Sequence, residues 1–67
     1  MSPREQMAEK LKALRERRGL TQEQLSEKSG VSRSYLARLE TGRQDPTLST
    51  LEKLAKALGV KVGRLLE

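Results

Sequence analysis

The stretch from residue 20 to residue 40, LTQEQLSEKSGVSRSYLARLE, decides the fold of this chain. Thr21 can cap the free N–H groups at the start of a helix, and Gln24 stands at the reciprocal position of a capping box. Gly30 suits the left-handed residue that ends a helix, and Ser32 can cap the next one. The stretch therefore predicts two short helices joined by a tight turn. They cover about residues 22–29 and 33–41.

Three further helices are predicted, one before this pair and two after it. Each of four glycines follows a segment in which apolar residues recur with helical spacing, which is where a left-handed residue that ends a helix belongs. These glycines are Gly19, Gly30, Gly42 and Gly59. The further segments cover about residues 4–18, 48–58 and 61–67, and the last lacks a good capping residue. We therefore expect one all-α domain over residues 1–67, a compact arrangement of five helices.

The predicted core of this domain is built around the segment 48–58. Its apolar stripe is the most regular in the chain, and it consists of Leu48, Leu51, Leu54, Ala55 and Leu58. In the first segment, Met7, Leu11 and Leu14 recur on one helical face. A chain of 67 residues supports a single core, worth only about 3–5 kcal/mol.

Composition excludes several classes of function. The chain has no Cys and no His, which rules out disulfides, thiolate zinc sites and catalysis by a thiol or an imidazole. No phosphate-binding loop and no metal-ligand spacing occurs either, so we expect no enzyme activity, no cofactor, no metal and no small-molecule ligand. The apolar runs are too short to span a bilayer, and the start of the chain lacks a signal peptide, so we expect no membrane partner and a cytoplasmic, nucleoid-associated location.

The charge balance points to an acidic partner. Fourteen Lys and Arg residues against nine Asp and Glu residues give a formal net charge of +5, and the isoelectric point is near 10.1. Such a balance is typical of nucleic-acid-binding domains, but it also suits anionic membrane surfaces and acidic proteins.

The polar face of the segment 33–41 favours nucleic acid. Leu36 and Leu39 must face the core, and we call the residues left on the opposite side the outward strip. Arg33 lies in the first turn, where the helix dipole disfavours a cation, so its position suits a groove lined with phosphates and guanine acceptors rather than helix stability. An ordinary helical hairpin in a small bundle is the alternative. The outward strip, which we expect to contact DNA bases, consists of Arg33, Ser34, Ala37 and Arg38.

Two charges stand at the edges of apolar stripes. Arg15 follows Leu11 by one helical turn, and Glu40 follows Leu36 by one turn. Because isolated buried charges are costly, the two side chains are expected to form an ion pair where the first and third helices cross, fixing the angle of the third. The alternative is that both are solvated.

The run from Leu20 to Val60, with Gly30-Val31-Ser32 and Leu39-Glu40 at its centre, resembles the Xre-type, lambda-repressor-like helix-turn-helix family. The resemblance covers roughly residues 11–66 and implies a five-helix DNA-binding domain whose helix-turn-helix spans about 21–41. It implies base contacts by Arg33, Ser34 and Arg38, phosphate contacts by Gln22, Arg43 and Gln44, and an ion pair between Arg15 and Glu40.

Three residues need separate comment. Ser26 departs from the family pattern, which usually has Ala there, and we expect its hydroxyl to bond back to the preceding turn. Lys61 stands where a capping residue is common, which leaves the start of the last helix undefined. Tyr35 is either a partly buried ring at the edge of the core or a phosphate contact through its hydroxyl.

These observations predict a sequence-specific regulator of transcription that binds double-stranded DNA, a repressor on a palindromic operator. Two copies would be needed, as a homodimer on half-sites about 34 Å apart, because one domain of this size makes few contacts. The candidate dimer surface is Val62, Leu65 and Leu66, and the alternative is that all three complete the core of the same chain. A protein-interaction or antitoxin-like module using the same basic face is the other function that the sequence allows.

Overall fold

Within residues 2–66, which the computed structural model describes, the chain forms five α-helices and no strand. The helices are α1 (Pro3–Arg17), α2 (Gln22–Ser29), α3 (Arg33–Glu40), α4 (Leu48–Leu58) and α5 (Gly63–Leu66). The predicted all-α class is confirmed, and α2 and α4 have the predicted bounds. Helix α1 begins and ends one residue earlier than predicted, α3 ends one residue earlier, and α5 begins two residues later. The predicted end of the last helix at residue 67 lies outside the described residues.

The helix ends follow from local chemistry. The Thr21 side chain accepts a hydrogen bond from the Gln24 N–H, and the Gln24 side chain returns one to the Thr21 N–H, so the predicted capping box is present. Gly30 ends α2 with φ +80°, a left-handed conformation that favours glycine. A second capping box, between Ser2 and Glu5, starts α1 and was not predicted from the sequence.

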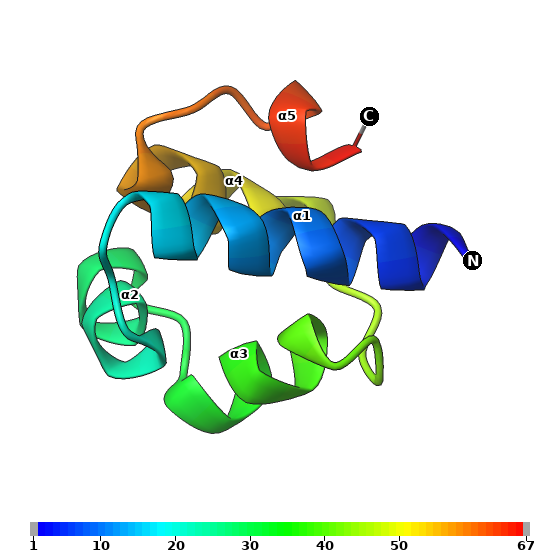
Figure 1. Cartoon of the computed structure of the whole chain (residues 1–67), viewed down its shortest axis with the longest axis horizontal. Helices are drawn as coiled ribbons and strands as arrows, with labels where there is room; N and C mark the ends of the chain where they lie inside the picture. Colours follow the sequence, from blue (N-terminus) through cyan, green and yellow to red (C-terminus); the bar gives the residue numbers. More distant parts are fainter. Residues whose placement is uncertain (1, 67) are drawn as a thin grey trace.

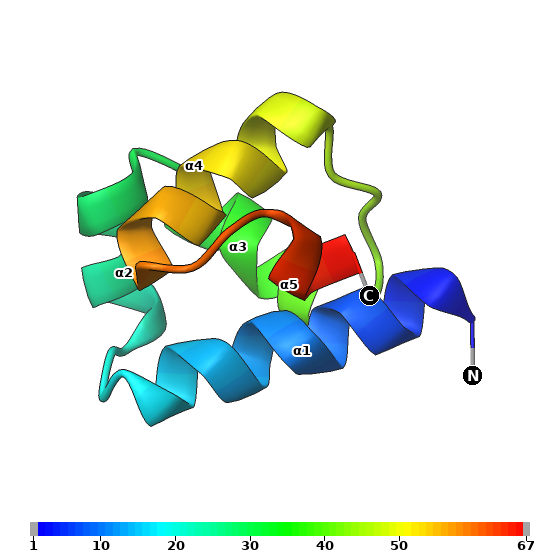
Figure 2. The ribbon, with the colours of Figure 1, turned by 90° about the horizontal axis from the view of Figure 1, so that it is seen from above.

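Helices α3 and α5 pack against α1, the longest of the five helices. In Figure 1, α5 lies above α1, whereas α3 lies below it and α2 beside its carboxyl end. Seen from above, α4 runs behind α1, with α5 between the two (Figure 2). Helix α2 contacts both α3 and α4, and α1 contacts both α3 and α5. Helix α3 therefore has one side against the bundle and the other side free.

Every helix contributes to one core of leucines. The largest fully buried side chains are Leu11, Leu25, Leu36, Leu39, Leu54, Leu58 and Leu65. The predicted stripe of α4 is correct except at its first member, because Leu48 is 59% exposed. Leu48 is the first residue of α4, and its side chain lies outside the core that the rest of the stripe enters.

The packing of the carboxyl-terminal segment bears on the two alternatives predicted for Val62, Leu65 and Leu66. Leu65 is only 1% exposed, and Val62 is partly buried against the same core. Helix α5 contacts α1 and α4, so Leu65 fills the space between these helices and is not free to contact a second chain. Leu66 alone of the three predicted residues is largely exposed, at 59%.

No helix within residues 2–66 combines the length and the apolar character needed to cross a bilayer.

The exposure of Leu48 can be tested against that of Leu54, since both leucines lie on α4. Leu54→Ala opens a cavity in the core and should lower the free energy of unfolding by about 2–5 kcal/mol, enough to unfold much of a domain this small. Leu48→Ala should change it by less than about 0.5 kcal/mol. Urea denaturation followed by circular dichroism measures both, and equal losses would contradict this account of the core.

Candidate nucleic-acid interface

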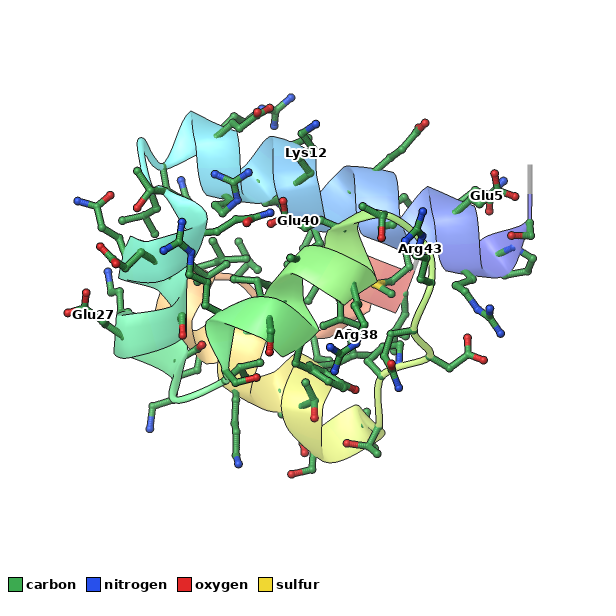
Figure 3. All side chains as sticks on the ribbon, turned by 90° about the horizontal axis from the view of Figure 1, so that it is seen from below. Glu5, Lys12, Glu27, Arg38, Glu40 and Arg43 are labelled. Carbon is green, nitrogen blue, oxygen red and sulfur yellow. The ribbon has the colours of Figure 1, made fainter. Side chains whose placement is uncertain are left out.

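Helix α3 presents the outward strip as predicted. Its opposite side is fully buried through Leu36 and Leu39. In Figure 3, which looks onto α3 from below, Arg38 and Arg43 lie near the carboxyl end of the helix, toward the viewer. The members of the strip are exposed at Arg33, Ser34 and Arg38 and half-buried at Ala37.

The turn between α2 and α3 is closed by side chains of α2. The Ser26 hydroxyl donates to the Val31 carbonyl oxygen at 2.5 Å, and the Val31 N–H donates to the Ser29 hydroxyl at 3.1 Å. The expectation that Ser26 bonds back to the preceding turn is therefore wrong. Its hydroxyl reaches forward because Val31 folds back over α2 to enter the core, which brings its carbonyl within reach.

A buried ion pair joins α3 to α1, as predicted. Arg15 donates from Nε to Glu40 Oε2 at 2.7 Å and from Nη2 to Glu40 Oε1 at 3.0 Å. The two side chains are only 11% and 2% exposed. A third hydrogen bond runs from Arg15 Nη1 to the Leu20 carbonyl oxygen at 2.7 Å. The hydrogen bonds to Glu40 raise the pKa of Arg15 above its usual value, so the guanidinium stays charged although it is buried.

Gln22 joins this network from the start of α2. Its side-chain amide donates to Glu40 Oε1 at 3.1 Å, and the residue is half-buried. An amide group has two N–H donors, so one remains for an outside acceptor. Among residues 2–66, every buried side-chain nitrogen or oxygen has a hydrogen-bond partner. The polar groups behind α3 are thus satisfied before any ligand arrives.

The two arginines of the outward strip are held differently. The Arg38 guanidinium lies 5.8 Å from the centre of the Tyr35 ring, and its Nε donates weakly to Gln44 Oε1 at 3.4 Å. Tyr35 is partly buried against the core, which agrees with the first of its two predicted roles. Arg33 faces Glu23 of α2 at 3.5 Å, with both side chains about two-thirds exposed at 65% and 64%. The Arg38 side chain is therefore restrained by two neighbours, whereas the Arg33 side chain has one long contact to an exposed carboxylate.

The segment after α3, residues 41–47, is here called the exit loop. It carries Arg43, which is exposed, and Gln44, which is half-buried. The Arg43 N–H donates to the Arg38 carbonyl oxygen at 3.0 Å, so the loop folds back on the end of α3.

The exit loop is also bound to the start of α1. Arg4 donates from Nε to Asp45 Oδ1 at 2.7 Å and from Nη2 to Asp45 Oδ2 at 2.5 Å. The hydrogen bonds from Arg4 lower the pKa of Asp45. The members of this pair are 41 positions apart, and it was not predicted from the sequence. One signal was available, because Arg4 lies in the first turn of α1 against the helix dipole, as Arg33 does in α3.

Two short helices joined by a tight turn, with a buried inner side and a cationic outer side on the second helix, define a helix-turn-helix domain. A family model described as Helix-turn-helix matches residues 11–65. The chain belongs to this family.

Relatives and solved structures agree with this assignment. The chain is 51% identical over 59 residues to the immunity repressor protein of Bacillus phage phi105, covering 88% of this chain and 41% of that protein. It is 36% identical to the restriction-modification controller protein C.AhdI of Aeromonas hydrophila, with a TM-score of 0.89 over 91% of this chain and 92% of that one. The biofilm regulator SinR, solved in complex with DNA, gives 35% identity and a TM-score of 0.88, with coverage of 91% and 98%. The chain thus spans about two-fifths of the phage repressor and nearly all of the two solved chains.

The buried ion pair predicts a large effect of one charge. Glu40→Gln keeps the size of the side chain but leaves the Arg15 guanidinium buried without a counter-charge, so the free energy of unfolding should fall by about 1–3 kcal/mol. Glu23→Gln makes the same change in the exposed pair with Arg33 and should cost less than about 1 kcal/mol. Chemical denaturation of both variants measures the difference. Similar losses in the two would show that burial of the Arg15–Glu40 pair has no energetic role.

The pair between Arg4 and Asp45 predicts a pH dependence. Because the folded pKa of Asp45 is lowered, its contribution to stability is present above the unfolded pKa of about 3.9 and is lost as the pH falls through the folded value. The melting temperature of the wild type should therefore exceed that of Asp45→Asn at neutral pH, and the two should converge in strong acid. Calorimetry from pH 7 downward tests this, and a difference that stays constant would contradict it.

Proposed function

We propose that this domain is a sequence-specific regulator of transcription that binds double-stranded DNA by inserting α3 into the major groove. The observation that carries the proposal is the outward strip, which stands on a helix that is held rigidly from behind by buried leucines and by the Arg15–Glu40 pair. An α-helix fits the major groove of B-DNA, where each base pair presents a distinct pattern of donors and acceptors.

The residues of the site take two kinds of role in this proposal. Arg33 and Arg38 contact base edges, since arginine pairs with the two acceptors of guanine. Ser34 supplies a short polar contact, and the small side chain of Ala37 lets the helix approach the bases closely. Backbone phosphates are contacted by Gln22, Arg43 and Gln44, and a contact through the Tyr35 hydroxyl stays a prediction.

We further propose that the domain represses transcription as a homodimer on a palindromic site. The name of the phage relative supports repression. One domain offers few base contacts, and two copies on half-sites about 34 Å apart would multiply its affinity. Leu66 is the exposed apolar residue of the predicted dimer surface.

Selection of bound sites from a random pool of DNA duplexes tests the function directly. The expected result is an enriched motif with two inverted half-sites one helical turn apart. Enrichment of a single half-site would support base reading by α3 and contradict the proposed homodimer. Binding without any preferred sequence would contradict base reading by α3, and no binding to duplex DNA at low salt would contradict the function itself.

Substitutions separate base reading from phosphate contact. Arg38→Ala should weaken binding to the selected site by about 1–3 kcal/mol and relax its specificity. Arg43→Ala should weaken binding evenly across sequences and reduce the slope of log affinity against log salt by about 1. Arg64→Ala is the matched control, because it removes the same charge from α5, on the other side of α1 from α3 (Figure 1). Fluorescence anisotropy on matched and scrambled duplexes measures all three, and equal effects would contradict the assignment of roles.

A further inference from the structure

The contact between the start of α1 and the exit loop has no evident role in the core. We propose that the bidentate pair of Arg4 and Asp45, here called the Arg4–Asp45 clamp, is a positioning device that holds the exit loop in the geometry for phosphate binding. Arg4 and Asp45 are then determinants of DNA affinity although neither carries a base contact. This inference rests on the function proposed above.

The clamp holds the middle of the exit loop, where backbone hydrogen bonds among residues 2–66 are missing. Among residues 2–66, backbone–backbone hydrogen bonds hold both ends of the exit loop: the Arg43 N–H donates to the Arg38 carbonyl oxygen at 3.0 Å, and the Thr47 carbonyl oxygen accepts from the Leu51 N–H at 3.0 Å. Between these two points the hydrogen bonds are made by side chains, weakly from Arg38 to Gln44 at 3.4 Å and strongly from Arg4 to Asp45 at 2.7 and 2.5 Å. The strongest of these restraints therefore comes from another helix.

Gly42 lies close to the same helical turn, on the other side of the residues proposed to contact phosphate. Gly42 has φ +74°, and a Cβ built on it would lie 3.4 Å from the Cγ atom of Glu5. Glu5 is itself fixed, since its N–H donates to the Ser2 hydroxyl at 3.2 Å in the capping box of α1. Arg43 and Gln44 thus lie between Gly42, which lies beside the first turn of α1, and Asp45, which is hydrogen-bonded to that turn.

The exposure of its two side chains indicates that the clamp contributes little to the stability of the fold. The Arg4 and Asp45 side chains are 45% and 70% exposed. Exposed ion pairs contribute little to the free energy of unfolding. A bidentate arginine–carboxylate pair nevertheless fixes a direction as well as a distance, so it orders a loop better than a single hydrogen bond does.

The charge of Asp45 allows a test, because an electrostatic role and a positioning role predict opposite changes in DNA affinity. Asp45 places a negative charge on the loop that carries Arg43, and a negative charge near DNA opposes binding. If charge alone mattered, Asp45→Asn would strengthen DNA binding. If the clamp positions the loop, the same change weakens it, because the loop must then be ordered at the moment of binding.

The experiment measures the affinity of the full chain for its selected duplex. Asp45→Asn should bind about threefold to tenfold more weakly than the wild type, with a shallower salt dependence and a small change in melting temperature. Glu52→Gln is the matched control, because it removes a negative charge from an exposed position on α4, and its affinity should equal or slightly exceed that of the wild type. The exchanged pair, Arg4→Asp with Asp45→Arg, should regain most of the affinity that either single exchange loses.

A double substitution shows whether the clamp acts through the loop. In a chain that already carries Arg43→Ala, adding Asp45→Asn should cost less than half of the factor that it costs alone, since the contact it positions is gone. Full additivity would overturn the assignment of the clamp to Arg43.

Different outcomes would contradict the role of the clamp and the proposed DNA-binding function. Equal or tighter binding by Asp45→Asn, with Arg38→Ala still impaired, overturns the clamp and leaves the proposed function intact. A wild-type chain that binds no duplex overturns both. A loss of affinity in Asp45→Asn that follows a large drop in melting temperature, and is not restored by the exchanged pair, also overturns positioning and assigns the pair to folding.

Discussion

The carboxylate of Glu40 is the point on which the arrangement of this molecule depends. It accepts hydrogen bonds from Arg15 of α1 and from Gln22 of α2, and it belongs to α3. Helix α3 has only eight residues, too few to be stable in isolation. Leu36 and Leu39 bury its inner side, and Glu40 joins its carboxyl end to α1 and α2. A helix that is weak alone therefore becomes a fixed part of the surface.

Three arginine–carboxylate pairs show how burial divides the work of charged groups. The Arg15–Glu40 pair is almost fully buried and holds helices together. The Arg4–Asp45 clamp is half-exposed, and the pair of Arg33 with Glu23 is mostly exposed. Water screens the two exposed pairs, so they contribute little to the free energy of unfolding. One of them contacts the exit loop, and the other contacts a single side chain of the outward strip. The strength of each restraint thus decreases from the core of the molecule toward the surface proposed to meet DNA.

The features that the sequence predicted well are those decided within a few residues. Capping boxes, glycine ends and apolar spacing act between near neighbours, so the bounds of α2 and α4 were predicted correctly. The Arg15–Glu40 pair was also predicted, because a charge at the edge of an apolar stripe requires a partner. Leu48 was wrongly placed in the core, and the role of Leu65 was left open, because helical spacing shows which face is apolar and not how far a neighbouring helix extends. The Arg4–Asp45 clamp depends on where the exit loop meets α1, which no local pattern contains.

The separation between the two sides of α3 has a consequence for how such a domain evolves. Its inner side is fully buried, while Arg33, Ser34 and Arg38 on the outer side make no core contact. Replacing exposed residues of this kind changes stability by only about 0.5 kcal/mol. Mutation can therefore explore new side chains on the outward strip while the scaffold stays folded. The same 67-residue architecture can thus diverge toward many different target sequences without a new fold having to arise for each one.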